Sequence, residues 1–328
     1  MATSFITQLL AAEAANQSML CVGLDPEPAK FPTAWAGDAR RMFDFCAAIV
    51  DATADQVIAF KPQIAYFAAH RAEHQLERLI AHIHRVAPGV PVILDAKRGD
   101  IGSTAQQYAV EAFERYQADA VTLSPLMGFD SIEPYLAYDG KGLFLLCRTS
   151  NPGGSELQSQ RLAAAPGSPA DAPGDLLFEH IAKLAAGPWN RSGRLGLVVG
   201  ATYPAEINRV RALAPTLPLL IPGVGAQGGD AQATVHAGWR GSVAGAGSAG
   251  AGAGVNANTS ANSSADTSAD TSADTSADTS ADTSANTSGP IIVSSSRAVL
   301  YASAAADFAS AARGVAQATR LALQAARR

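Results

Sequence analysis

The chain is poor in cysteine, and its three cysteines, Cys21, Cys46 and Cys147, lie far apart in the sequence. An odd number at wide spacing argues against a disulfide framework and favours a reducing compartment. No apolar run approaches the ~20 residues needed to cross a bilayer. Residues Met1–Leu10 lack the basic start and the long apolar core of a secretory signal. Together these absences predict a cytoplasmic protein.

The sequence also lacks an excess of basic residues. It has 24 Lys and Arg against 29 Asp and Glu, a formal net charge of −5, which does not indicate a nucleic-acid-binding surface. Five of the acids lie in a repeat without any Lys or Arg, so the remainder balances 24 acids against 24 bases. A chain of 328 residues that is 48% hydrophobic and 16% charged suits a globular protein with a sizeable core.

Residues 241–289 have almost no apolar bulk. They begin as Ala/Gly repeats and continue as A-D-T-S repeated in register. Such a composition cannot offset the conformational entropy lost on ordering. We expect a disordered insertion within one catalytic domain formed by residues 1–240 and 290–328. A regulatory or partner-binding segment is the alternative.

Short apolar runs alternate with helical patterns along the rest of the chain. The expected strands are Met19–Leu24, Val57–Phe60, Val90–Leu94, Ala120–Leu123, Gly142–Cys147, Leu195–Val199, Pro218–Ile221 and Ile291–Val293. Alternation of this kind indicates parallel βα units, and eight of them predict a (β/α)8 TIM barrel. An open doubly wound sheet is the alternative, and it explains eight strands less well. One long helix is expected over Ala65–Val86, and Ser103 with Gln106 predicts a capping box before a helix over Thr104–Gln117.

The third predicted strand ends in a cluster of charge. Asp95, Lys97 and Asp100 follow its apolar run, and residues two apart on a strand share a face. Burying charge is costly unless it is paired, and perturbed titratable groups favour functional sites. Because barrel chemistry lies at the carboxyl ends of the strands, we interpret this cluster as a candidate active site. A salt-bridged strand end without function is the alternative.

A glycine-rich loop follows the seventh predicted strand. Residues 223–228 fit G-x-G-x-x-G, but a dinucleotide site requires that motif at the first βα turn, so we reject this interpretation. Glycines let backbone N–H groups approach an anion, and barrels often bind phosphate after strands seven and eight. Arg297, just past the eighth strand, would add a bidentate donor. A plain turn and a surface arginine are the alternative.

Two other motifs carry less weight. His70 and His74 fit H-x-x-E-H, which occurs in zinc proteases, but no third ligand is evident and a catalytic zinc normally has three protein ligands. No G-x-S-x-G motif is present, so a hydrolase triad is not supported.

Taken together, these residues resemble the orotidine 5′-phosphate decarboxylase family, and most closely its longer bacterial branch. The resemblance covers the whole chain except 241–289. The motifs that carry it are D-A-K-R-G-D-I-G-S-T at 95–104, I-P-G-V-G-A-Q-G-G-D at 221–230, C-V-G-L-D-P at 21–26, F-K-P at 60–62, T-S-N-P-G at 149–153 and S-S-R at 295–297.

The resemblance implies a decarboxylase that makes uridine 5′-monophosphate without metal or organic cofactor. It implies catalytic roles for Lys61, Asp95, Lys97 and Asp100, with Lys97 as proton donor. It implies nucleotide contacts from Asp25, Ile101, Thr104, Ser150, Pro222, Gln227 and Arg297, with Gly223 and Gly225 in the phosphate loop. Asp100, Ile101 and Thr104 would reach the site of a second subunit, which implies a homodimer with shared sites.

Two other functions stay open at this point. A metal-dependent sugar-phosphate lyase of the same superfamily would need an acidic ligand at the end of the second strand, where this chain has Lys61. A non-catalytic phosphate-ligand binder would have the repeat as its working part.

Overall fold

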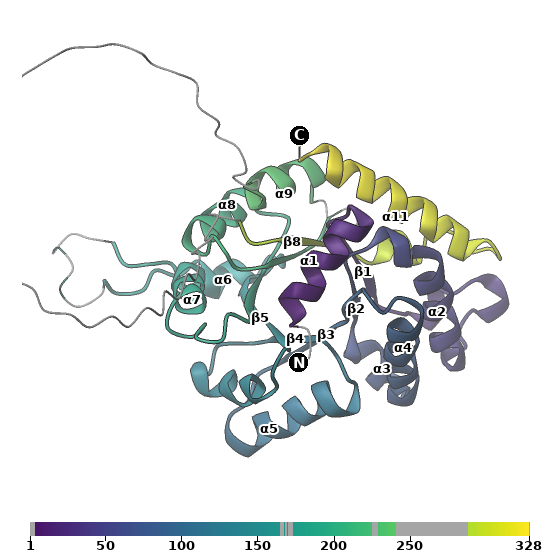
Figure 1. The fold of residues 1–328 in the computed structure, drawn as a ribbon, viewed down its shortest axis with the longest axis horizontal. Helices are drawn as coiled ribbons and strands as arrows, with labels where there is room; N and C mark the ends of the chain where they lie inside the picture. Colours follow the sequence, from purple (N-terminus) through teal and green to yellow (C-terminus); the bar gives the residue numbers. More distant parts are fainter. Residues whose placement is uncertain are drawn as a thin grey trace, which may run out of the picture. The chain divides into compact units, whose positions relative to one another are not determined.

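The computed structural model describes residues 4–164, 167, 169, 173–224, 229–240 and 288–327. Eight parallel strands form one sheet: β1 (Leu20–Leu24), β2 (Ala59–Pro62), β3 (Ile93–Arg98), β4 (Ala120–Leu123), β5 (Gly142–Arg148), β6 (Leu195–Val199), β7 (Leu219–Pro222) and β8 (Ile291–Ser295). Strands that are neighbours in sequence pair with each other, and β8 pairs with β1. Bridges between Phe60 and Val92 and between Gln63 and Asp95 join β2 to β3. The (β/α)8 prediction is confirmed, and the open-sheet alternative is wrong (Figure 1).

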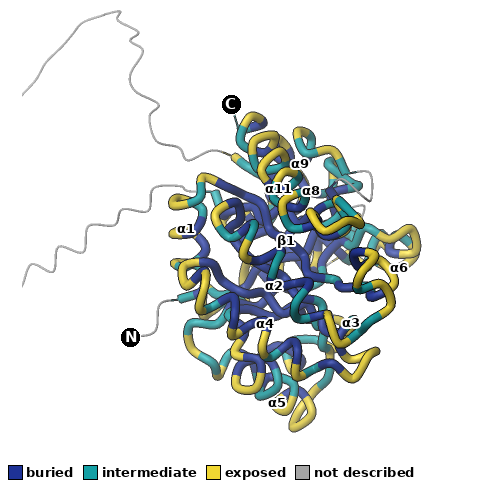
Figure 2. Tube along the Cα trace, turned by 90° about the vertical axis from the view of Figure 1, so that its right-hand side faces the viewer, coloured by how far each residue is buried: buried dark blue, intermediate teal, exposed yellow. Residues whose placement is uncertain are grey.

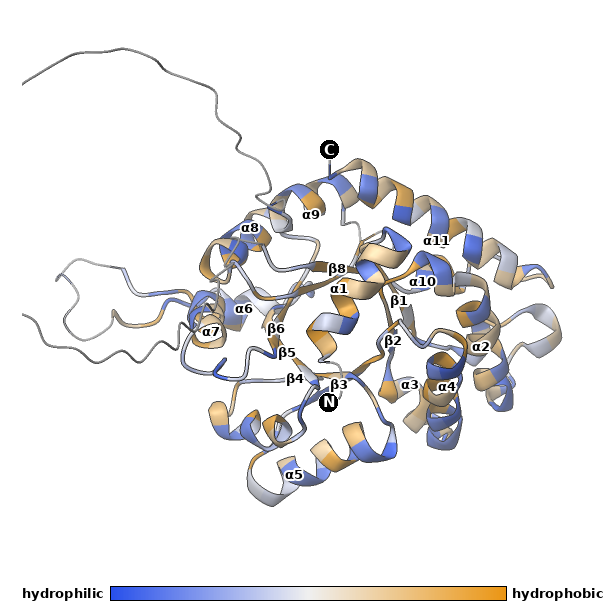
Figure 3. Cartoon of the chain, in the orientation of Figure 1, coloured by the Kyte–Doolittle hydropathy of each residue, from blue (hydrophilic) through white to orange (hydrophobic). Residues whose placement is uncertain are grey.

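Helices surround the barrel with their apolar faces inward (Figures 2 and 3). They are α1 (Phe5–Asn16), α2 (Met42–Thr53), α3 (Ile64–Ala69), α4 (Glu73–Val86), α5 (Gly102–Val110), α6 (Gly154–Gln158), α7 (Leu177–Ala186), α8 (Pro204–Leu213), α9 (Ala231–Gly238), α10 (Arg297–Leu300) and α11 (Phe308–Ala325). None of these described helices combines the length and apolarity that a membrane crossing requires. The three cysteines are buried and unpaired.

Helix α1 closes the barrel at the amino ends of the strands. Its Phe5, Leu9 and Ala12 belong to the same buried cluster as the inward-facing strand residues. The Phe5 ring meets the Phe144 ring edge-on at 5.6 Å, and the Phe5 amide donates to the carbonyl of Gly140. Among the described residues, this end of the barrel is plugged, and the cavity lies at the carboxyl ends of the strands.

Two local predictions are wrong. The helix expected over 65–86 is two helices, α3 and α4, because Arg71 takes a left-handed φ of 54° between them. The capping box at Ser103 is absent: α5 begins at Gly102, so Ser103 lies inside the first turn and Ile101 occupies the cap position without a side-chain bond. Gly102 itself has a φ of 56°, a conformation glycine adopts without strain.

Arg211 of α8 is buried at the plugged end of the barrel. Its guanidinium donates only to backbone carbonyls, among them those of Gly238, Leu217, Gly289 and Pro290. Burial lowers the pKa of this guanidinium to about 10, so it stays charged at neutral pH. One side chain therefore bonds both the residues before position 241 and those after position 287, and the segment between lies outside the described residues.

Candidate active site

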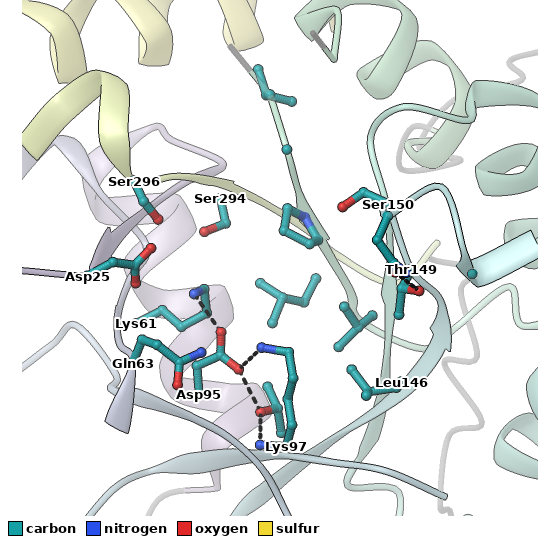
Figure 4. Close-up of a pocket in the computed structure, with 18 of the residues that line it drawn as sticks. Asp25, Lys61, Gln63, Asp95, Lys97, Leu146, Thr149, Ser150, Ser294 and Ser296 are labelled. Atoms are coloured by element: carbon teal, nitrogen blue, oxygen red, sulfur yellow. Dashed lines mark hydrogen bonds and ion pairs between the residues drawn. The ribbon is translucent and has the colours of Figure 1, made fainter. Parts of the chain in front are cut away.

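A cavity of about 640 Å³ opens at the carboxyl ends of the strands (Figure 4). Polar side chains from strands on both sides of the barrel line it: Asp25, Lys61, Gln63, Tyr66, Asp95, Lys97, Thr122, Thr149, Ser150, Asn151, Gln158, Ser294, Ser296 and Arg297. The volume lies in the range of small-molecule sites. The cavity thus lies at the carboxyl ends of the strands, where the sequence predicted the site.

Asp95 is the centre of the charged cluster. Its Oδ2 lies 3.0 Å from Lys61 Nζ and its Oδ1 lies 2.6 Å from Lys97 Nζ. The Asp95 and Lys61 side chains are 10% and 6% exposed, whereas that of Lys97 is 48% exposed. The carboxylate therefore joins one buried ammonium to one that faces the cavity, as Figure 4 shows.

Opposite charges fix the protonation of the buried pair. Burial would raise the pKa of Asp95, but Lys61 and Lys97 outweigh it and hold that pKa well below its usual range. Burial would lower the pKa of Lys61, but Asp95 and Asp25 outweigh it and raise that pKa. Both groups are therefore ionised at neutral pH.

The backbone around Lys97 departs from a regular strand. The register between β3 and β4 shifts between Leu94 and Arg98, and Lys97 has a left-handed φ of 48°. Strain of this kind concentrates at functional sites. The hydroxyl of Thr122 stabilises the irregular segment: it accepts from the amides of Ala96 and Lys97 at 3.0 Å and donates to Asp95 Oδ1 at 2.9 Å.

Asp25 lies beside Lys61 at the end of β1. Its Oδ1 is buried and has no hydrogen-bond partner within the described chain. The Tyr301 hydroxyl fixes the backbone here, because it donates to the Asp25 carbonyl at 2.8 Å and accepts from the Glu27 amide at 2.7 Å. A buried carboxylate oxygen without a donor is costly, so this oxygen is suited to accept from a ligand hydroxyl.

The other side of the cavity is formed by the segment after β5 and by β7. Ser150 faces Asp25 and Lys61 across the opening in Figure 4. Pro222 and Gly223 line the end of β7, and Gly223 has a φ of 106°, which only glycine adopts readily. Arg297, the first residue of α10, lies exposed at the rim. The predicted phosphate-loop residues Gly225 and Gln227 lie outside the described residues.

Three predicted residues do not line this cavity: Asp100, Ile101 and Thr104. Asp100 accepts from the amide of Ile101 at 2.8 Å. Ile101 and Thr104 are exposed at the start of α5. Within one chain, these three residues therefore lie outside the cavity that the Asp95 cluster lines.

Several lining residues were missed from the sequence, among them Gln63, Tyr66, Thr122 and Asn151. Gln63 follows Lys61 by two residues, so strand alternation could have found it. Thr122 lies inside an apolar run, where a threonine is indistinguishable from an ordinary strand residue. Tyr66 lies on α3, whose separate existence was not predicted.

His70 and His74 do come together, in a smaller cavity of about 240 Å³. Arg40, Arg71 and Arg78 line the same cavity. Three guanidiniums repel a cation, so the surroundings of His70 and His74 disfavour a zinc ion. No group of three or more potential metal ligands occurs among the described residues.

Comparison with known sequences identifies close relatives. A profile described as the orotidine 5′-phosphate decarboxylase / HUMPS family matches residues 18–254. An orotidine 5′-phosphate decarboxylase of Polaromonas naphthalenivorans is 78% identical over 237 residues, 72% of this chain and 82% of that protein. One from Methylibium petroleiphilum is 65% identical over 299 residues, 91% of each chain.

Solved structures of proteins named OMP decarboxylase and UMP synthase are also similar to this chain. The OMP decarboxylase of Leishmania donovani superposes with a TM-score of 0.69 at 33% identity, covering 97% of this chain and 99% of that one. The UMP synthase of the same organism gives a TM-score of 0.72 at 33% identity, covering 98% of this chain and 57% of that one.

Proposed function

The chain belongs to the orotidine 5′-phosphate decarboxylase / HUMPS family, and from this premise we propose that it converts orotidine 5′-monophosphate to uridine 5′-monophosphate and CO2. This reaction is the last step of de novo pyrimidine nucleotide synthesis. The observation that carries the proposal is the Lys61–Asp95–Lys97 chain of ion pairs at the floor of the cavity.

Lys97 supplies the proton in the proposed reaction. The bond between C6 of the pyrimidine and the carboxylate breaks, CO2 leaves, and the electron pair stays on C6. The Lys97 ammonium stabilises this negative charge and then transfers a proton to C6. The neutral amine recovers a proton from solvent. Asp95 orients the ammonium through their 2.6 Å contact, and its own negative charge lies near the departing carboxylate.

The remaining residues bind the nucleotide in this proposal. The buried Oδ1 of Asp25 and the ammonium of Lys61 contact the ribose hydroxyls. Ser150 contacts the pyrimidine edge. Arg297 holds the phosphate together with Gly223, Pro222 and the loop that follows. Binding energy from the distant phosphate then contributes to transition-state stabilisation.

Lys61 also separates this proposal from the metal-dependent alternative. Its ammonium lies 3.0 Å from Asp95 Oδ2, where it neutralises a carboxylate that a metal would need. Ultraviolet absorbance of orotidine monophosphate should decline with purified enzyme at an unchanged rate in the presence of a chelator. Loss of turnover on chelation, restored by magnesium, would instead support a metal-dependent sugar-phosphate lyase.

We also propose a homodimer in which Asp100, Ile101 and Thr104 complete the partner's site. Large apolar side chains are exposed after β3 and β4: Ile101 is 46%, Leu126 67% and Met127 54% exposed. Exposed apolar groups gathered at one rim favour a protein interface. Asp100 lies outside its own chain's cavity, which supports a role in another.

Mixing two inactive variants tests the shared site. If Asp100 acts in the partner's site, a heterodimer of Lys97→Ala and Asp100→Ala has one intact site. Random exchange at equal amounts should then restore about a quarter of the wild-type activity, as expected for an isologous dimer. The measurement is decarboxylation before and after subunit exchange. No recovery despite confirmed exchange would place Asp100 in its own subunit's site.

We further propose that catalysis belongs to residues 1–240 and 290–328 alone. Replacing residues 241–287 with a short Gly/Ser linker should leave kcat/KM within about twofold, because loop length changes closure entropy only slowly. Activity and molecular mass in solution are the measurements. A fall of tenfold or more, or loss of the dimer, would assign the repeat a working role.

A further inference from the structure

Arg148, the last residue of β5, is 1% exposed and, with Arg211, has the largest fully buried side chain among the described residues. Its Nη2 donates to Ser155 Oγ at 2.7 Å, and its Nη1 donates to Gln158 Oε1 at 3.3 Å and to the Thr149 carbonyl at 3.0 Å. All three acceptors belong to residues 149–158, the segment that we call the β5 loop. Burying a guanidinium is costly, so its bonds indicate a specific requirement for this loop geometry.

The other face of Arg148 is attached to the barrel wall. Its Nε lies 2.6 Å from Glu206 Oε2 of α8, and its guanidinium stacks on the Tyr203 ring at 4.2 Å from the centroid. The Gly200 amide donates to the Arg148 carbonyl at 2.7 Å. Arg148 thus connects the β5 loop to the start of α8.

The β5 loop forms a large part of the cavity. It contributes Thr149, Ser150, Asn151, Gly153, Gly154, Leu157 and Gln158 to the lining. Asp25, Lys61, Asp95 and Lys97 come from other strands. A displacement of this loop would therefore change one side of the cavity and leave the charged cluster in place.

Two glycines show how closely the loop fits its supports. A Cβ at Gly154 would lie 2.9 Å from Arg148 Nη1, and a Cβ at Gly200 would lie 2.8 Å from Ser150 Cα. Real Cβ atoms essentially never come this close to another atom, and at Gly200 the neighbouring atom belongs to the backbone. The position of Ser150 is therefore determined by Gly200 on one side and by the loop that Arg148 holds on the other.

We propose that Arg148 is a positioning residue for recognition of the pyrimidine ring: it holds the β5 loop so that Ser150 meets the base edge. The inference rests on the proposed function, because it takes the base to lie against this loop. Within the described chain, the bonds of the Arg148 side chain go to residues 149–158 and to the start of α8, and none of them goes to Asp25, Lys61 or Arg297, the residues proposed to bind the ribose phosphate.

The test compares two ligands that differ only in the base. Arg148→Met should raise KM for orotidine monophosphate and Ki for uridine monophosphate about tenfold to a hundredfold, as expected when a recognition group moves by about 1 Å. Ki for ribose 5-phosphate, which has no base, should stay within about twofold, because Asp25, Lys61 and Arg297 are untouched. Arg148→Lys keeps the positive charge but loses the planar, two-pronged donor geometry of the guanidinium. Its KM for orotidine monophosphate should therefore lie between those of the wild type and Arg148→Met.

Arg211→Met is the matched control, since Arg211 is also 1% exposed but bonds carbonyls at the plugged end of the barrel. It should lower the Tm and leave the ratio of the two Ki values unchanged. If Arg148→Met fails to fold, Ser155→Ala removes one acceptor and should shift the same ratio in the same direction.

The outcomes are distinguishable. Equal changes in both Ki values, or an unchanged KM in folded Arg148→Met, would overturn the role of Arg148. Absence of turnover in the unaltered chain would overturn the proposed function, and in that case the dissociation constants of uridine monophosphate and ribose 5-phosphate, measured by calorimetry, still report whether Arg148 governs binding of the base.

Discussion

Replacement of Lys97 with alanine should lower kcat by about 10⁴-fold or more, because it removes both the proton donor and the charge that stabilises the carbanion. Lys97 is the ammonium of the cluster that faces the cavity, and Lys61 is buried behind Asp95. A water molecule that took the place of this ammonium, 2.6 Å from Asp95, would carry no positive charge. Loss of transition-state stabilisation should therefore appear in kcat far more than in ligand binding.

Single-turnover decarboxylation and the Ki for uridine monophosphate are the measurements. Binding should weaken by no more than about tenfold, since the phosphate and ribose ligands remain. Lys183→Ala is the matched control: Lys183 of α7 pairs with Asp175, neither residue lines the cavity, and the variant should retain full activity. A decrease in kcat of less than about tenfold for Lys97→Ala would assign proton donation to another group.

Asp95→Asn should reduce both activity and stability. Lys61 is 5% exposed, and removal of its buried partner leaves an uncompensated ammonium, at a cost of about 3–5 kcal/mol in the free energy of unfolding. The same change releases Lys97 from its 2.6 Å contact. Misorientation of the donor should lower kcat by about 10²-fold or more. Urea denaturation and steady-state kinetics are the two measurements.

The loss of stability in Asp95→Asn should become smaller as the pH falls. The pKa of Asp95 is held below its usual range by Lys61 and Lys97 despite burial. A carboxyl of this kind stabilises the fold fully above its unfolded pKa of about 4, and this stabilisation is lost as the pH falls through the folded-state pKa. The difference in unfolding free energy between wild type and Asp95→Asn should therefore narrow below about pH 4.

Asp44→Asn provides the surface reference for this experiment. Asp44 pairs with Arg41, but both side chains are substantially exposed, at 40% and 48%. Exposed pairs contribute at most about 1 kcal/mol, so this variant should unfold nearly as the wild type does. A stability difference for Asp95→Asn that stayed constant down to about pH 2 would contradict the assignment of Asp95 as the ionised partner.

The barrel and the position of its site could be predicted from the sequence because both depend on strong local signals. Buried parallel strands read as apolar runs, and charged residues such as Asp95 and Lys61 stand out where those runs end. The break at Arg71 could not be predicted, because no glycine or proline marks it. The same limit applies to the start of α5, where Gly102 rather than Ser103 sets the boundary.

The roles of Thr122 and Arg148 depend on contacts between distant segments. Thr122 stabilises an irregularity in β3 that no local pattern encodes. Arg148 reads in sequence as a charged residue after a strand, which is ordinarily solvated. Only its neighbours on α6 and α8, which come from other parts of the chain, show that it is buried. Sequence patterns thus found the groups that carry charge in the cavity, but not those that hold them in place.

The bonds of Arg211 have an evolutionary consequence. Because one guanidinium binds the carbonyls of Gly238 and Gly289, it holds together the points where the chain leaves and re-enters the barrel. Each doubling of the connection then costs only about 0.6 kcal/mol. Insertions and deletions between Gly238 and Gly289 should therefore be tolerated in evolution, because these two residues lie at the end of the barrel opposite the cavity. For the same reason, a reporter domain inserted at this junction should leave the barrel folded.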